Sequence, residues 1–348
     1  MNNVFDCRTI MSVIYPTTHK QDLFVKFGIQ RVLKKQMNIS THHIDSSGKS
    51  HNRNFRMSKL AFIKHLAIAG QAYSPSPQKL FRTIGMLLHY SHYMQSRAFN
   101  AGRFSEPPIT LSDPTEKAQF SNLAGKAIAD FLSKRIDNSL FTVNYESAMR
   151  IQGHKLKGQR PDLIAYTQNS IFAIEAKGRH QPNSGNMTVH KAQSQTGPIP
   201  VNFSIACVSY NLFNNVACNY HDPFNDNIEY DNTSLRILSR NYYKGISEFL
   251  NSDVFDFEEA EIQGEKFYAV GLSRRNYEKF FFDGFPFRGM WELEFFHFLK
   301  PKLIIPYRIR EYSEVGISND FTPFLFESNE QSDYIYIDND RIGLSLSR

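Results

Sequence analysis

Three charged residues stand at the ends of two apolar segments near the middle of the chain. Residues 158–178 read GQRPDLIAYTQNSIFAIEAKG, with Asp162 directly after Pro161, and with Glu175 and Lys177 separated by one alanine. The apolar runs DLIAY and SIFAIEAK flank the turn-like TQNS, so the sequence predicts a β-hairpin. Successive strand residues point to opposite faces, so Glu175 and Lys177 share a face, and Asp162 lies beside them on the neighbouring strand.

Two carboxylates and an ammonium group that converge at one edge of a sheet suit a hydrolytic metal site. Charges at the end of an apolar strand cost desolvation energy unless a partner binds them. Mg²⁺ and Mn²⁺ prefer carboxylate oxygens, and such a cation stabilises the charge that develops when water attacks a phosphodiester. We therefore expect Asp162, Glu175 and Lys177 to be catalytic. In the alternative interpretation, Glu175 and Lys177 form a surface ion pair and Asp162 is a turn residue after proline.

A third metal ligand is expected from the preceding helix. The segment 113–137 predicts a helix with Asp113 as N-cap and Pro114 at the first helical position. Glu116 lies four residues before Phe120 and extends the apolar face of this helix by one turn. We therefore favour Glu116 as the third ligand over Glu146, which falls near the end of a predicted strand at 140–149.

The motifs Pro161-Asp162 and Glu175-Ala176-Lys177 resemble those of the PD-(D/E)XK nuclease superfamily. The resemblance covers roughly residues 111 to 215, where a helix, three strands, a helix (187–195) and a strand (201–210) are predicted in the order of that superfamily's core. It implies an α/β (α+β) fold with a restriction-endonuclease-like core, a mixed central sheet flanked by helices. It also implies that Asp162 and Glu175 bind the catalytic metal and that Lys177 assists the attacking water.

The charge of the chain is uneven and predicts three regions. Residues 1–110 hold 15 Lys/Arg against 4 Asp/Glu, residues 111–220 hold 11 against 7, and residues 221–348 hold 14 against 23. We expect a basic, mainly helical region at 1–110, the nuclease core at 111–220, and an acidic α+β region of unknown role at 221–348. Basic groups release counterions from phosphates, so the first region is expected to bind nucleic acid, through Lys59, Lys64 and Arg82 among others.

Four basic residues next to the motifs are expected to contact phosphates near the scissile bond. These are Lys155, Lys157, Arg160 and Arg179. The chain shows neither an apolar run that would span a membrane nor a secretory signal, and its three cysteines suit the cytoplasm.

Together these features predict a cytoplasmic, Mg²⁺-dependent endonuclease that cuts double-stranded DNA, in restriction or antiviral defence. The alternative is a catalytically silent or partner-activated subunit of the same fold that binds nucleic acid or assembles with protein. In that case a protein partner or a second copy would bind the acidic C-terminal region.

Overall fold

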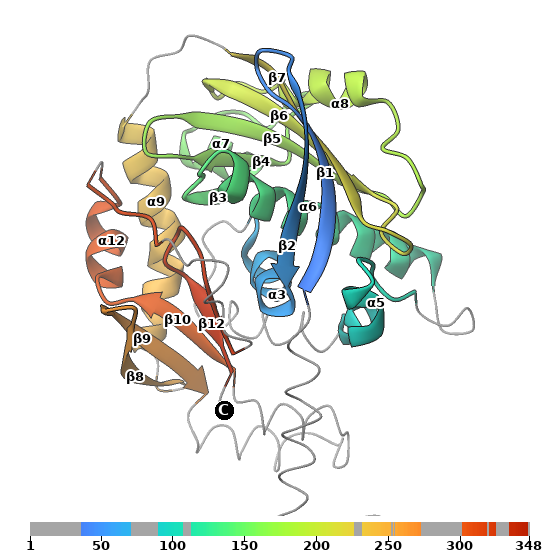
Figure 1. The fold of residues 1–348 in the computed structure, drawn as a ribbon. Coiled ribbons are helices and arrows are strands. Elements are labelled where there is room, and N and C mark those ends of the chain that lie inside the picture. Colours follow the sequence, from blue (N-terminus) through green and yellow to red (C-terminus); the bar gives the residue numbers. More distant parts are fainter. Residues whose placement is uncertain are drawn as a thin grey trace, which may run out of the picture.

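The computed structural model describes residues 36–70, 90–106, 113–225, 232–251, 253, 255–272, 301–318, 320–324 and 334–346. These residues form a mixed α+β fold around two sheets (Figure 1). The seven-stranded sheet has the order β2-β1-β7-β6-β5-β4-β3, and the five-stranded sheet has the order β11-β12-β10-β9-β8. In the described ranges, no helix combines the length and the apolar composition needed to cross a bilayer.

The strands of the seven-stranded sheet are β1 (Gln36–Ile44), β2 (Ser50–Ser58), β3 (Phe141–Asn144), β4 (Leu163–Tyr166), β5 (Ile171–Gly178), β6 (Phe203–Tyr210) and β7 (Ala217–Asn225). Those of the five-stranded sheet are β8 (Phe255–Ile262), β9 (Glu265–Leu272), β10 (Lys302–Pro306), β11 (Ile335–Ile337) and β12 (Gly343–Ser345). The helices are α3 (Lys59–Ile68), η1 (Ser91–Met94), α5 (Ser96–Asn100), α6 (Pro114–Ile136), α7 (Tyr145–Ile151), α8 (Met187–Ser194), α9 (Asn232–Ser247), η3 (Glu248–Asn251) and α12 (Ile309–Val315).

The central part of the chain confirms most of the predicted elements. The carboxylate of Asp113 caps α6 by accepting a hydrogen bond from the Thr115 amide, with Pro114 in the first turn. The β4–β5 hairpin, α8 and β6 all form within a few residues of their predicted bounds. In the C-terminal region the sequence predicts hairpins at 258–272 and 332–347 with a helix at 274–281 between them. The hairpins form as β8–β9 and β11–β12. The segment 274–281 lies outside the described residues.

The predicted strand at 140–149 is wrong after its fifth residue. β3 ends at Asn144, whose side-chain oxygen accepts a hydrogen bond from the Ser147 amide and so starts α7. Asparagine is among the best N-cap residues, and this local bond competes with continuation of the strand. Glu146 is therefore a first-turn residue of α7, not a strand residue.

The polar sequence of residues 42–56 predicts a loop within the region expected to be mainly helical, but this segment forms most of the β1–β2 hairpin. Its turn is closed by Asp45, whose Oδ1 accepts hydrogen bonds from the amides of Ser47 and Lys49. Gly48 supplies the left-handed conformation (φ +80°) that this turn needs. β1 also pairs in parallel with β7, so residues 36–58 extend the same sheet that holds β4 and β5.

Helices cover both faces of the seven-stranded sheet around β5. A Cβ added to Gly178 at the end of β5 would lie 1.7 Å from the Ser121 carbonyl oxygen, so α6 lies directly against this residue. Ala176 shares that face, because side chains alternate along a strand. Glu175 and Lys177 therefore face the other side, where Ser194 of α8 donates a hydrogen bond to Ser204 of β6.

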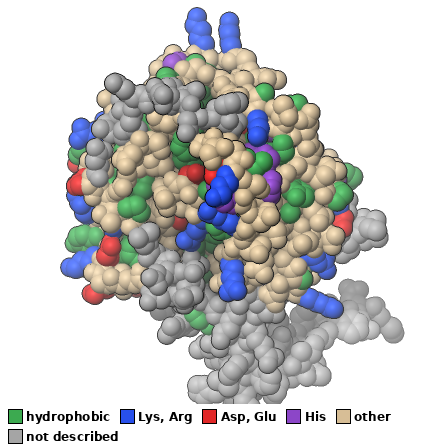
Figure 2. Space-filling model, turned by 45° about the horizontal axis from the view of Figure 1, so that its top comes forward, with side chains coloured by type: hydrophobic (Ala, Val, Ile, Leu, Met, Phe, Trp, Pro, Cys, Tyr) green, Lys and Arg blue, Asp and Glu red, His purple; other side chains and the backbone are tan. Residues whose placement is uncertain are grey.

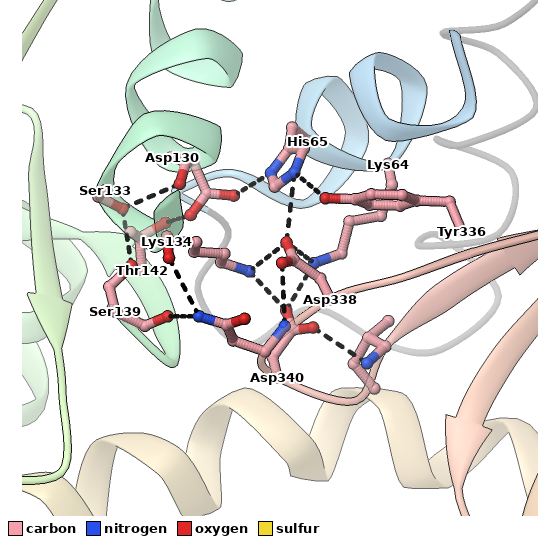
Figure 3. A network of polar contacts seen from close by, with 12 residues as sticks. Lys64, His65, Asp130, Ser133, Lys134, Ser139, Thr142, Tyr336, Asp338 and Asp340 are labelled. Carbon is pink, nitrogen blue, oxygen red and sulfur yellow. Dashed lines mark hydrogen bonds and ion pairs between the residues drawn. The ribbon is translucent and has the colours of Figure 1, made fainter. Parts of the chain in front are cut away.

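A buried cluster of charges joins the C-terminal segment to the core (Figure 3). Lys64 of α3 lies 2.7 Å from Asp340 and 3.1 Å from Asp338, measured from Nζ to Oδ2. Lys134 of α6 approaches the same two oxygens at 3.0 and 2.9 Å. All four side chains are at most 2% exposed. This burial gives the ion pairs a role in fixing how residues 338–340 dock between α3 and α6.

The prediction that Lys59 and Lys64 bind nucleic acid is therefore wrong. Lys64 is fully buried in the cluster above, and Lys59 is 7% exposed and donates a hydrogen bond to Ser96. Charge counting could not detect this, because it does not say which partner each lysine has. Arg82 lies outside the described residues.

The buried cluster predicts a large stability effect. Asp340→Ala should lower the free energy of unfolding by about 3–5 kcal/mol, because Lys64 and Lys134 would keep one carboxylate where they now have two. Urea denaturation of the full chain measures this. The matched variant Glu259→Ala, on the exposed side of β8, should change stability by about 0.5 kcal/mol or less. Equal effects of the two variants would contradict a structural role for the cluster.

Candidate functional site

The pairing of β4 with β5 brings the motif residues together. Leu163 lies opposite Ile174, and the Asp162 amide donates a hydrogen bond to the Ile174 carbonyl at 3.1 Å. The Asp162 side chain then accepts a hydrogen bond from the Ala176 amide at 3.2 Å. Asp162 is thereby held beside Glu175, as the sequence predicted.

Four charged side chains meet at this point. Lys177 Nζ lies 2.6 Å from Glu175 Oε1 and 3.3 Å from Asp162 Oδ2. The other carboxylate oxygen of Asp162 lies 3.1 Å from the Nζ of Lys126, which comes from α6. Two carboxylates are thus set against two ammonium groups, and both lysines are about one-third exposed.

Glu175 is the unusual member of this group. Its side chain is fully buried, and Lys177 is the partner of its Oε1, whereas Oε2 accepts no hydrogen bond from the described part of the chain. Burial, and then the negative charge of Asp162, raise its pKa to about 7, against the opposing effect of Lys177. Burial of an ionised carboxylate destabilises the folded chain unless a partner binds it. A metal cation can be that partner, because it can replace the proton that Glu175 carries at lower pH.

Lys177 remains charged in this environment. Burial alone would lower its pKa, but the carboxylates of Asp162 and Glu175 outweigh that effect and raise it. A charged ammonium group next to two carboxylates is suited to contact a phosphate once a metal ion compensates those carboxylates.

The structure does not bring Glu116 to this site. Glu116 lies in the first turn of α6, where its Oε1 is 3.3 Å from His92 Nε2 and 3.5 Å from the Tyr93 hydroxyl. Lys126 is ten residues further along the helix, which corresponds to about 15 Å along the axis. The helical face was predicted correctly, since Phe120 is fully buried, but the position along the axis was not.

Glu146, the alternative third ligand, is engaged by Arg160. Arg160 Nε donates to Glu146 Oε1 at 2.9 Å, and Nη2 of the same guanidinium contacts that oxygen. No group of three or more His, Cys, Asp or Glu side chains able to hold a metal occurs within the described ranges. Asp162 and Glu175 would therefore be the side-chain ligands, which suits Mg²⁺ because it commonly binds one or two carboxylates and keeps several waters.

The predicted phosphate-contacting residues occupy different environments. Lys155 and Lys157 are exposed in the segment between α7 and β4, whereas Arg160 is paired with Glu146. The Nη2 of Arg179 lies 3.1 Å from Nε2 of His190 on α8. Lys155 and Lys157 are therefore the two whose charges are directly open to solvent.

α8 contributes two further groups around the motif. Gln193, one of the two glutamines that the resemblance indicated in this helix, donates a hydrogen bond to the Arg160 carbonyl at 3.2 Å. Burial, and then the charges of Arg179 and Lys177, lower the pKa of His190, so its imidazole is neutral at neutral pH. His190 is 7% exposed.

Lys126 is the residue that sequence reasoning missed. It follows Gly125, whose added Cβ would meet the backbone of Gly178 at 2.3 Å. Only this close packing of α6 on β5 brings Lys126 to Asp162, and no local spacing signals it. Comparison with known proteins adds no homologue: no family model, curated protein or solved structure matches the chain.

The raised pKa of Glu175 predicts pH-dependent metal binding. Below about pH 7 the carboxyl is protonated, so a cation must displace that proton. Mn²⁺ affinity should therefore fall about tenfold for each unit of pH below this value and level off above it. Calorimetric titration of the full chain with Mn²⁺ between about pH 5.5 and 8.5 measures this dependence.

The matched variant is Glu175→Gln, which keeps the shape of the side chain and cannot ionise. It should bind Mn²⁺ weakly at every pH and lose the change centred near pH 7. A wild-type affinity that stays flat across that range would contradict Glu175 as a ligand.

Proposed function

We propose that the chain is a metal-dependent nuclease, a Mg²⁺- or Mn²⁺-dependent endonuclease with a restriction-endonuclease-like core. The observation that carries this proposal is the meeting of Asp162, Glu175 and Lys177 across β4 and β5, with the Glu175 carboxylate fully buried and its Oε2 without a hydrogen bond in the described part of the chain. An isolated surface ion pair, the alternative interpretation, would not place a carboxylate at zero exposure.

The arrangement of elements supports the same proposal. A helix (α6) precedes an antiparallel β3-β4-β5 meander, and α8 then leads to β6, which pairs in parallel with β5. This is the order that the motif resemblance implies, with the short α7 inserted between β3 and β4. The carboxylates stand where β4 begins and β5 ends, at an edge that substrate can approach.

The side chains have distinct tasks in the proposed reaction. A divalent cation would stabilise the negative charge that develops at the phosphorus oxygens and would lower the pKa of a bound water. Asp162 and Glu175 would hold it. Lys177 orients the attacking water, and the ammonium group of Lys126 meets the phosphate from the α6 side. Lys155, Lys157 and Arg179 contact neighbouring phosphates and position the strand rather than read its sequence.

Double-stranded DNA is the proposed substrate, and restriction or antiviral defence in the cytoplasm is the proposed setting. A second candidate, a partner-activated or catalytically silent assembly subunit, is favoured by one observation. β8 is an edge strand of the second sheet and exposes the acidic side chains of Asp256, Glu258 and Glu259. A basic protein partner could bind these carboxylates, which lie on a different sheet from the proposed catalytic residues.

Cleavage assays test the catalytic proposal. Purified chain is incubated with plasmid, linear duplex, single-stranded DNA and RNA in Mg²⁺, Mn²⁺ or EDTA. We expect cleavage of duplex DNA with either metal and none in EDTA. Asp162→Asn and Lys177→Ala should each reduce the rate at least 100-fold, of the order of the loss on removing a transition-state contact.

The matched control is Glu116→Gln, which alters an acid of α6 that lies away from the site and should retain cleavage within about threefold, as expected of a residue that makes no transition-state contact. Cleavage that persists unchanged in Asp162→Asn would refute the catalytic assignment. Cleavage that appears only after addition of a protein partner would favour the partner-activated form.

A further inference from the structure

The β1–β2 hairpin widens the sheet on the same face as the catalytic residues. Paired residues of neighbouring strands point to the same face. Lys177 pairs with Val208, Val208 with Asn219, Asn219 with His42, and His42 with Asn52. This row carries the face of Lys177 across four more strands, from β5 to β2.

The outward face of the hairpin is polar from Asn38 to His42 and from Asn52 to Arg56. We define the hairpin face as Asn38, Ser40, His42, Asn52, Asn54 and Arg56. Residues between them in β1 and β2, such as Ile39 and Met57, are buried on the opposite side against the core. The hairpin face holds no carboxylate, so it presents amides, an imidazole and a guanidinium to solvent.

Histidines connect the hairpin face to β7. His42 Nδ1 lies 3.4 Å from Nε2 of His221, and Nε2 of His42 lies 2.8 Å from the Ser50 hydroxyl. Burial, and then the charge of Lys191 on α8, lower the pKa of His221 to about 4. In Figure 2, histidine and Lys/Arg side chains lie next to each other near the middle of the face that includes this part of the molecule.

We propose that the hairpin face binds the sugar–phosphate backbone of the nucleic acid whose scissile phosphate meets Lys177. This inference rests on the proposed nuclease function and adds a binding surface that the catalytic motifs do not include. Asn54 and Arg56 are its central contacts, because both are exposed and lie on the outer strand of the hairpin.

Geometry fixes how far from the cut this contact falls. Neighbouring strands are about 4.8 Å apart, so β1 lies about 14 Å and β2 about 19 Å from β5. One strand of B-form DNA advances about 3.4 Å per nucleotide, so these distances correspond to about four to six nucleotides. The hairpin face therefore contacts the substrate about half a helical turn away from the scissile bond.

Charge decides which surface of the molecule the backbone follows. The exposed residues of β8 include Asp256, Glu258 and Glu259, which repel phosphates. The hairpin face lacks carboxylates and has Arg56 exposed on β2. Amide and imidazole groups donate hydrogen bonds to phosphate oxygens without regard to base sequence.

Binding assays with a fluorescein-labelled duplex of 24 base pairs in EDTA test the proposal. Asn54→Asp adds a negative charge and Arg56→Ala removes a positive one, so each lowers the net charge of the hairpin face by one unit. Each should raise Kd about threefold to tenfold at low salt, and Arg56→Ala should reduce the slope of log K against log salt by about one. The matched control is Asn169→Asp, the same charge change in the exposed turn at the far end of the β4–β5 hairpin; it should leave Kd unchanged.

Two outcomes separate this inference from the nuclease proposal. If Asn54→Asp and Arg56→Ala bind the duplex as tightly as Asn169→Asp does, the hairpin face is not a binding surface. The nuclease function would still stand if Asp162→Asn abolished cleavage. Wild-type chain that neither binds the duplex nor cleaves it overturns both. Weaker binding by the hairpin variants together with full binding by Asp162→Asn supports the inference independently of catalysis.

Discussion

The register of β4 against β5 is the constraint on which the site depends. Leu163 pairs with Ile174, so Asp162 and Glu175 are neighbours on the same face. A slip of one residue would move one carboxylate to the opposite face, toward α6, because side chains alternate along a strand. Two hydrogen bonds fix this register at the site: the Asp162 amide donates to the Ile174 carbonyl, and the Ala176 amide donates to the Asp162 side chain. Backbone pairing therefore aligns the charged side chains.

The packing of α6 on β5 also sets the electrostatics of the site. α6 can lie against the end of β5 only because Gly125 and Gly178 have no side chains at their contact. This approach delivers Lys126 to Asp162, while Glu175 remains out of contact with water. Two ammonium groups thus compensate a carboxylate pair in which one member is partly protonated near neutral pH. A divalent cation would compensate the two carboxylates in place of the lysines, and the lysines would then be available to a phosphate.

Local signals explain what the sequence could predict and what it could not. The N-cap Asp113, the alternating strands around TQNS and the spacing of the motif residues act over a few positions, and each was confirmed as structure. The sequence did not predict β1, because its parallel partner β7 is about 175 residues away and one of its faces is polar. The burial of Lys64 was missed for a similar reason, since its carboxylate partners lie 274 and 276 residues further along the chain.

These long-range contacts also join the described parts of the three predicted regions. The C-terminal segment reaches α3 and α6 through Asp338 and Asp340, and α6 in turn lies against the strand that holds Glu175 and Lys177. β1 and β2 complete the same sheet from the other edge. Basic residues near the N-terminus are therefore divided between two uses. Lys64 is neutralised inside the molecule, and Arg56 remains exposed on β2.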